Sequence, residues 1–422
     1  MGLRRRDFIN RSVIAAGAGI VTGFSSFRKK DNNTIEPILL PNDIPPPITD
    51  AERLTRIAKA QQLMAEKKIE AVVIDSGTTL MYFTGVSWWP SERTFVAIIP
   101  AKGDIKYVCP AFEEDRFREL LKIGKDVYVW QEDESPYKLI ATALKDSGIK
   151  AGKIGMEERL RFFVFDGLRK EAAHLEYVSA DPVTAQCRLI KSAAELALMQ
   201  KANDITVAAI KAGIAALKEG DSPAVFAAAV AATHEKLGGN HDFAMANFAE
   251  ASALPHGSVK PQKLKAGDIV LMDCGCSVHG YSSDISRTIV FGAEPTKRQL
   301  DIWNLEKQSQ AAGFAAAKLG SPCENVDAAA RKVLTDAGFG PGYRLPGLPH
   351  RTGHGIGMDG HEWGNMVKGN KQLLQVGMCF SVEPTIAIPG EFGVRLEDCA
   401  YMAEDGVRWF SQPSPSISQP FA

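Results

Sequence analysis

The chain has 422 residues, which is more than one hydrophobic core usually serves, so we expect two domains. Its 49 Lys and Arg residues balance 50 Asp and Glu residues, and this gives no electrostatic reason to expect a nucleic acid as partner. Hydrophobic residues make up 45% of the chain, the content of an ordinary globular protein. Apart from its ends, the chain therefore does not have the composition of a disordered protein, and its charge balance argues against a nucleic-acid-binding one.

The chain begins with a basic and then an apolar segment. Arginines fill positions 4–6, and an apolar stretch of small residues covers 12–23, so that residues 1–30 resemble a twin-arginine export signal. The other interpretation is a basic start before a short buried helix. A spanning helix needs about 20 apolar residues, so we expect no stable membrane span. We expect export to the periplasm and leave open whether the signal is cleaved or retained as an anchor.

A proline-rich linker and an α/β domain follow. Residues 31–50 contain the run Pro45-Pro46-Pro47 and are typical of an exposed linker. Residues 51–183 then alternate helical and strand patterns. The clearest elements are a helix over 51–67 and strands over 71–75, 95–100 and 106–109.

Residues 184–412 form the second predicted domain, and residues 413–422 a tail. Helical patterns cover 192–217, 223–237, 296–318 and 325–337, and each pair of helices is followed by strands that carry acids. This order indicates two similar halves.

Two acids lie in the first pair of strand-like segments. Asp273 and Asp284 are joined through residues 278–281, and their midpoint falls between Val278 and His279. We expect a hairpin folded there to place the two carboxylates directly opposite one another. Ordinary surface acids are the alternative, but the neighbouring residues are too apolar for a solvated pair.

A second pair of acids repeats the arrangement. Glu383 and Glu397 lie in strand-like segments over 378–388 and 392–402, and their midpoint is Gly390. A salt bridge to Arg395 or Arg287 is the alternative explanation for these acids.

Four converging carboxylates require a cation. Like charges opposite one another on a hairpin are destabilising, and buried carboxylates cost several kcal/mol each without compensation. His354, in a glycine-rich segment, supplies an imidazole, although it could also be a structural histidine. Four carboxylates and one imidazole are too oxygen-rich for a thiolate-type zinc site and suit a pair of divalent ions.

The seven cysteines are odd in number and scattered, which does not indicate a disulfide framework. Cys274 and Cys276 flank Asp273, but strand alternation directs them to the other side of the sheet. We therefore expect packed thiols.

The five candidate ligands follow one another in the order Asp, Asp, His, Glu, Glu. Their local sequences are Met272-Asp273-Cys274-Gly275, Ser283-Asp284-Ile285, Gly353-His354-Gly355, Val382-Glu383-Pro384 and Leu396-Glu397-Asp398. This order and these settings resemble the pita-bread metallopeptidases of family M24. Within them the chain is most similar to the Xaa-Pro aminopeptidase and prolidase branch, over roughly residues 50–410. The resemblance implies an α/β creatinase-like N-terminal domain, which helps to form a homodimer, and an α+β pita-bread catalytic domain.

The resemblance also implies roles for single residues. Asp273 would hold one metal ion, His354 and Glu383 the other, and Asp284 and Glu397 would bridge both. Glu383 would take a proton from a metal-bridging hydroxide that attacks the scissile carbonyl. His256 and His361 match the family's two non-ligand histidines and would assist the oxyanion and the leaving group. Position in the sequence adds two residues: His350 lies in the same segment as His354 and would line the pocket, and Arg395, two residues before Glu397 and on the same strand face, would orient the ligand carboxylates.

Oxygen ligands favour Mn²⁺, with Zn²⁺, Co²⁺ and Fe²⁺ as alternatives. The implied activity is removal of the N-terminal residue from a peptide with proline at the second position. The sequence leaves open an aminopeptidase or a dipeptidase, and the strictness of the proline preference. The rivals are a lyase or small-molecule hydrolase on the same scaffold, a disfavoured creatinase-like amidinohydrolase and a metal-free binding module.

Overall fold

The first domain is a six-stranded mixed sheet with helices on both faces. We describe residues 44–421 from a computed structural model; the predicted export signal and most of the predicted linker lie outside these residues. The elements are α1 (Asp50–Lys67), β1 (Ile69–Asp75), α2 (Thr78–Thr84), β2 (Val96–Pro100), β3 (Lys106–Pro110), α3 (Glu114–Leu120), β4 (Asp126–Trp130), α4 (Pro136–Asp146), β5 (Lys153–Met156), α5 (Phe162–Glu171), β6 (Glu176–Ser179) and α6 (Thr184–Leu189). The strand order is β4-β3-β2-β1-β5-β6.

Local signals in the sequence fix the start of this domain. Thr49 caps α1, because its hydroxyl accepts a hydrogen bond from the backbone N–H of Glu52, and Lys68 ends the helix in a left-handed conformation. Strand β1 lies inside the sheet and is buried on both faces: Val72 packs into one hydrophobic cluster and Val73 into another. The predicted helix and strands are confirmed, with ends shifted by one or two residues.

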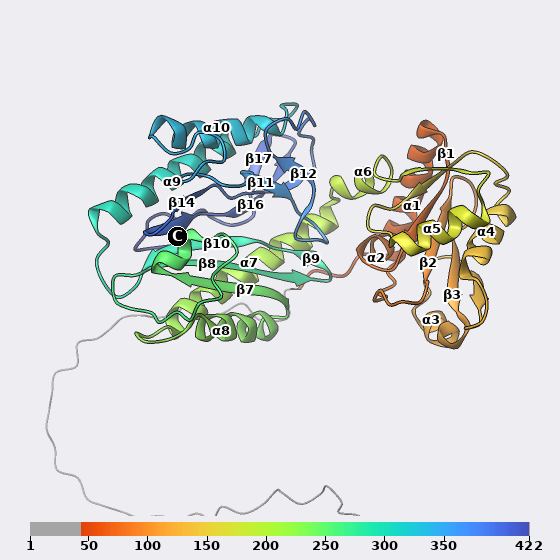
Figure 1. Cartoon of the computed structure of the whole chain (residues 1–422), viewed down its shortest axis with the longest axis horizontal. Helices are drawn as coiled ribbons and strands as arrows, with labels where there is room; N and C mark the ends of the chain where they lie inside the picture. The colour runs from red at the N-terminus through yellow and green to blue at the C-terminus, as the bar shows by residue number, and fades with distance from the viewer. Residues whose placement is uncertain (1–43, 422) are drawn as a thin grey trace, which may run out of the picture. The chain divides into compact units, whose positions relative to one another are not determined.

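The second domain begins with two helices that cover a small antiparallel sheet. Its first half consists of α7 (Ala193–Ala216), α8 (Pro223–Lys236), β7 (Asn240–Phe248), β8 (Ile269–Val278), β9 (Tyr281–Ser282) and β10 (Ile285–Val290). The strands run in the order β10-β8-β7, with β9 paired to β8 (Figure 1). A capping box starts α7: Ser192 and Glu195 each bond to the other's backbone N–H.

The second half repeats the pattern of a helix pair followed by strands. It consists of α9 (Lys297–Ala316), α10 (Glu324–Asp336), β11 (Gly353–Gly355), β12 (Glu362–Met366), β13 (Cys379–Val382), β14 (Thr385–Ile388), β15 (Phe392–Arg395), β16 (Asp398–Ala403) and β17 (Gly406–Trp409). Five of the strands form the sheet β12-β11-β13-β16-β17, and β14 pairs with β15. The sheets of the two halves lie between the helix pairs α7–α8 and α9–α10 (Figure 1).

The register of the first hairpin differs from the prediction. Asp273 pairs with Ser286 and not with Asp284, because the chain turns tightly at His279 and Gly280. Both turn residues have positive φ, 48° and 84°, as a two-residue hairpin turn requires. The shift is two residues, and side chains alternate with a period of two, so Asp273 and Asp284 still project from the same face.

The predicted register of the second hairpin is confirmed. Thr385 pairs with Arg395 on one side of the break and Val382 with Asp398 on the other, which keeps Gly390 at the turn. The prediction of two continuous strands is wrong, because the ladder is interrupted at Glu383 and Glu397. Their backbones turn to other strands: Glu383 N–H donates to the Thr352 carbonyl, and Glu397 exchanges backbone hydrogen bonds with Ser286.

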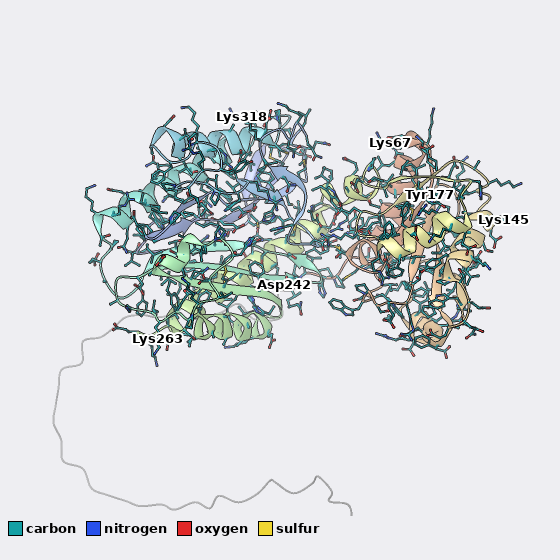
Figure 2. All side chains as sticks on the ribbon, viewed as in Figure 1. Lys67, Lys145, Tyr177, Asp242, Lys263 and Lys318 are labelled. Atoms are coloured by element: carbon teal, nitrogen blue, oxygen red, sulfur yellow. The ribbon has the colours of Figure 1, made fainter. Side chains whose placement is uncertain are left out.

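Both domains belong to one compact unit, which includes every described residue. Charged side chains such as Lys67, Lys145, Lys263 and Lys318 are exposed on it (Figure 2). Within residues 44–421 we find no helix whose length and apolar character would let it cross a bilayer.

Candidate metal centre

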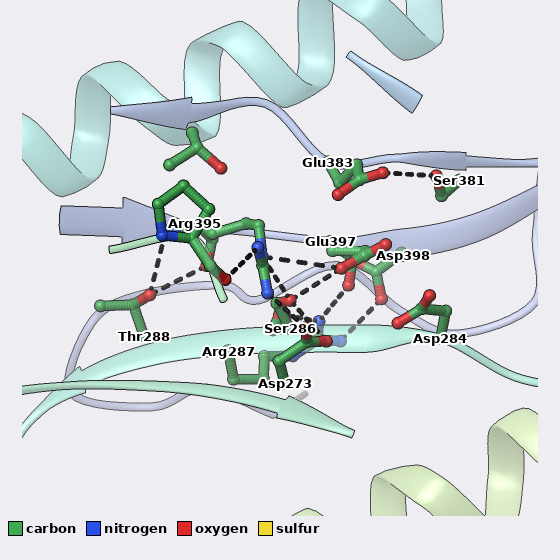
Figure 3. Close-up of polar contacts among 12 residues, drawn as sticks. Asp273, Asp284, Ser286, Arg287, Thr288, Ser381, Glu383, Arg395, Glu397 and Asp398 are labelled. Atoms are coloured by element: carbon green, nitrogen blue, oxygen red, sulfur yellow. Dashed lines mark hydrogen bonds and ion pairs between the residues drawn. The ribbon is translucent and has the colours of Figure 1, made fainter. Parts of the chain in front are cut away.

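Five side chains that are far apart in the sequence meet between the two hairpins of the second domain. Asp273 projects from β8, and Asp284 lies between β9 and β10. His354 is the middle residue of β11. Glu383 and Glu397 occupy the interruptions of the second hairpin (Figure 3). The structure thus brings together every residue that was predicted as a metal ligand.

The distances are short enough for shared cations. His354 Nε2 lies 3.1 Å from a Glu383 oxygen, 3.6 Å from an Asp284 oxygen and 4.0 Å from a Glu397 oxygen. Ligand atoms of Asp273, Asp284 and Glu397 also lie within 4.8 Å of one another. The acids therefore form two overlapping groups that share Glu397, as a pair of bridged ions requires.

Burial makes this concentration of charge costly. Asp284 is 7% exposed and Glu397 1% exposed. Burial raises the pKa of Asp284 well above its usual range, and the charges of Glu397, Asp273 and Glu383 raise it further. The pKa of Glu397 is raised in the same way, by burial and by Glu383 and Asp273. One oxygen of Asp284 and one of Glu397 have no hydrogen-bond partner among the described residues, so these oxygens fit divalent ions.

His354 is arranged to offer one nitrogen to this centre. Its Nδ1 lies 3.1 Å from the Gly355 carbonyl, which can only accept a hydrogen bond, so Nδ1 carries the proton. With an ion bound, the lone pair of Nε2 would face that ion, as in metal-bound histidines, whereas in the metal-free protein Nε2 lies within hydrogen-bonding distance of Glu383. Without ions, burial opposes the ionisation of Glu383, but the neighbouring His354 lowers the pKa of Glu383 to about 2.

Arg395 neutralises only part of the negative charge. Its guanidinium bonds Asp273 and the Ser286 hydroxyl, and its Nε lies 3.8 Å from Glu397. A salt bridge to Arg395 was the alternative explanation for the second pair of acids. It does not account for Asp284 or for Glu383, which have no hydrogen bond or ion pair to an arginine in the described part of the chain. Arg395 therefore contacts Asp273 and leaves Asp284 and Glu383 without an arginine partner within the described residues.

A second arginine, Arg287, contacts the backbone of the ligand Glu397. Arg287 is fully buried, pairs with Asp398 at 2.7 Å and donates to the Glu397 carbonyl at 2.9 Å. Ser286 lies between the hairpins, with its hydroxyl 2.7 Å from Glu397. Ser286 and Asp398 were not predicted as site residues. The one indication of these two residues in the sequence is their position, because each lies two residues or fewer from a predicted ligand.

His361 lies against the centre. Its ring centroid is 4.0 Å from that of His354, and its Nδ1 lies 3.2 Å from an Arg351 nitrogen. Burial, together with the charges of His354 and Arg351, lowers the pKa of His361 to about 4. A nitrogen of His361 also lies within 4.8 Å of ligand atoms of Asp284 and His354, so the geometry permits it to approach an ion.

His256 and His350 occupy different surroundings. His256 is exposed beside a pocket of about 480 Å³ that Met245, Asn247 and Gly257 help to line. His350 is half-buried, with Nδ1 2.7 Å from the Arg351 carbonyl and Nε2 3.0 Å from the Thr385 hydroxyl. Of the two, only His256 is free of polar contacts within residues 44–421 and can turn towards a substrate.

The cysteines do not take part in the centre. All seven are buried and free, and Cys274 packs into the hydrophobic cluster beneath β8. Burial is the main reason that the pKa of the Cys274 thiol is raised well above its usual value, so this sulfur stays protonated.

Comparisons with known proteins agree with this geometry. The family model "Metallopeptidase family M24" matches residues 197–404, and "Creatinase/Prolidase N-terminal domain" matches residues 56–190. An uncharacterized peptidase of Schizosaccharomyces pombe is 34% identical over 86% of this chain and 83% of its own length. The Xaa-Pro dipeptidase of Lactobacillus delbrueckii subsp. lactis is 31% identical, over 85% of this chain and 97% of its own. The crystal structure of a prolidase from Thermococcus sibiricus is similar with a TM-score of 0.78 and 29% identity, covering 85% of this chain and 97% of the prolidase.

Proposed function

This chain belongs to metallopeptidase family M24, and from that premise we propose that it is an Xaa-Pro dipeptidase, which releases the residue before proline from a dipeptide. The observation that carries the proposal is the largely buried cluster of Asp273, Asp284, Glu383 and Glu397 around His354, in which one oxygen of Asp284 and one of Glu397 find no hydrogen-bond partner within residues 44–421. A lyase or a binding module finds no comparable support, because relatives such as the Xaa-Pro dipeptidases of two Lactobacillus species are peptidases.

We propose that two divalent ions occupy the cluster and that they are Mn²⁺. Carboxylate oxygens outnumber nitrogen donors at the centre, and no thiolate is near enough to favour a softer metal. When bound, such ions lower the pKa of a water molecule towards neutrality and polarise a carbonyl. Asp273 and His354 would bind at opposite ends of the centre, and Asp284 and Glu397 between them.

The side chains around the centre have separate tasks in this proposal. Glu383 stays ionised at neutral pH, because its pKa is low, and can accept a proton from an attacking water. His361 and His256 can donate hydrogen bonds to the carbonyl oxygen or to the departing nitrogen. Arg395 holds Asp273 in place through its fixed guanidinium.

The preference for dipeptides is tested with matched substrates. We expect purified protein with Mn²⁺ to hydrolyse an Xaa-Pro dipeptide, and to act poorly on a longer Xaa-Pro peptide and on a dipeptide without proline. Equal hydrolysis of the dipeptides with and without proline would contradict the proline preference. Faster hydrolysis of the longer peptide would instead identify an aminopeptidase.

Export by the twin-arginine route and a homodimer are further parts of the proposal. The arginines at positions 4–6 and the apolar stretch over 12–23 support export. Fractionation of cells that produce the native chain, or a variant with lysines at positions 4–6, tests it: we expect periplasmic protein only for the native chain. Light scattering of the purified protein tests the dimer.

A further inference from the structure

His361 lies in a short turn whose backbone N–H groups donate hydrogen bonds to a buried carboxylate. Glu362, the next residue, is 8% exposed, and one of its oxygens accepts the backbone N–H groups of Met358 at 3.0 Å and Asp359 at 3.2 Å. Its carboxylate thereby fixes the backbone of residues 358–362, the turn that carries His361. We refer to these five residues as the His361 turn.

Two cations outside the turn hold this carboxylate. Arg188, from the end of α6, bonds the same oxygen of Glu362, and Lys191 Nζ lies 2.8 Å from the other oxygen. The side chain of Arg188 is 1% exposed, and those of Glu362 and Lys191 are each 2% exposed. Burial raises the pKa of Glu362, but Lys191 and Arg188 outweigh it and bring that pKa down to about 2, so the acid stays ionised.

The contact is tightly packed as well as charged. A Cβ atom added at Gly357 would lie 2.6 Å from a Glu362 oxygen and 2.8 Å from Lys191 Cε. The backbone before the turn therefore touches the ion pair directly, and the pair cannot move without moving the turn.

The first domain also bonds to the His361 turn, through Asp359. Arg188 pairs with one oxygen of Asp359 at 2.6 Å, while Arg159 and the Thr78 hydroxyl bond the other oxygen at 2.9 and 2.7 Å. Arg188 also donates to the Thr79 hydroxyl at 3.2 Å. Arg188 is thus the side chain that joins the first domain to both acids of the His361 turn.

We propose that Arg188 is a positioning residue, which sets the place of His361 against the metal centre by holding Glu362 and Asp359. This inference rests on the proposed function, in which His361 contacts the substrate. The ring of His361 lies 4.0 Å from His354 and has one polar contact in the described structure, with Arg351. Its position is therefore determined by the backbone of its turn.

A matched variant separates positioning from general loosening of the protein. Arg56 is also a buried arginine, 5% exposed, which joins the first domain to the second through Glu195 and the Tyr281 hydroxyl. It makes no polar contact with residues 358–362. Arg188→Gln and Arg56→Gln remove comparable charges, but only the first releases the His361 turn.

Hydrogen exchange of the metal-free protein tests the structural part without any activity. We expect faster exchange of the Met358 and Asp359 amides in Arg188→Gln and no change there in Arg56→Gln. If Arg188→Gln does not fold, Arg188→Lys serves, because it keeps the charge but lacks the second nitrogen that bonds Thr79 and the planar guanidinium that fixes the two acids. Unchanged exchange in the Arg188 variant, or equal acceleration in both variants, would overturn the inference.

A double-mutant cycle tests the catalytic part. With an Xaa-Pro dipeptide and full metal content, we expect Arg188→Gln to lower kcat about 10- to 100-fold with little change in KM. In a His361→Asn background the same substitution should lower kcat by less than about twofold, because Arg188 acts through His361. Equal losses in both backgrounds would overturn the inference. An inactive wild type would refute the proposed function, and the exchange data would still decide the role of Arg188.

Discussion

Replacing Asp284 by Asn should stabilise the metal-free protein and abolish its response to metal. Ligand atoms of Asp284 and Glu397 lie within 4.8 Å of each other, and two unit charges at this distance repel by about 3.5 kcal/mol at an effective dielectric constant of about 20. In the metal-free protein Asp284 relieves part of this repulsion by holding a proton, since its pKa is raised. We therefore expect the amide to raise the free energy of unfolding by about 1–2 kcal/mol, which is about 2–8 °C in Tm for a domain of this size.

Metal should reverse the order of the melting temperatures of the wild type and the Asp284→Asn variant. An ion at 100 times its Kd adds about 2.7 kcal/mol to the free energy of unfolding of a protein that binds it. Wild type with Mn²⁺ should thus melt above the variant, while wild type with a chelator melts below it. Thermal melts with chelator and with Mn²⁺ provide the assay, and Asp301→Asn, an exposed acid on α9, is the control that should change neither. An Asp284→Asn variant that melts lower than wild type in chelator, or still gains stability from Mn²⁺, would refute the reasoning.

Three further predictions concern the same centre. Asp284 and Glu397 have raised pKa values in the folded protein and ordinary values of about 4 when unfolded, so the folded state holds more protons above pH 4. The metal-free protein should lose stability as pH rises from about 4 towards neutrality, and melts in chelator across this range should show it; a rise over the same range would contradict the pKa directions. Arg395→Met should weaken metal binding about 10- to 100-fold, as measured by calorimetry, because Asp273 loses its guanidinium partner. Unchanged affinity would show that Arg395 does not support metal binding. Glu383→Gln should lower kcat about 100-fold or more in a protein that still binds at least one ion, which stopped-flow turnover and metal analysis would check together.

The second hairpin shows what the sequence could predict. The turn at Pro389 and Gly390 leaves one register that pairs two apolar segments, and this register places Glu383 opposite Glu397. The two-residue turn at His279 and Gly280 was not anticipated, because His279 adopts a positive φ that non-glycine residues rarely take. The error of two residues did not change which face Asp284 occupies, so the cluster of acids could still be predicted.

Other features of the site have no local signal in the sequence. Arg188 bonds Glu362 across 174 positions and Asp359 across 171, and neither contact follows from periodicity or turn chemistry. Glu306 is a further example: it is fully buried on α9, with neither oxygen bonded to another described side chain or backbone group. Burial raises its pKa well above the usual value, but nothing in a helical pattern distinguishes it from an exposed glutamate.

Elemental analysis of the purified protein, combined with turnover of an Xaa-Pro dipeptide, tests the metal centre most directly. We predict about two divalent ions per chain in the active protein, loss of both ions and of hydrolysis after chelation, and recovery of hydrolysis in proportion to the Mn²⁺ restored. Undiminished hydrolysis by protein that contains no stoichiometric metal would contradict the account.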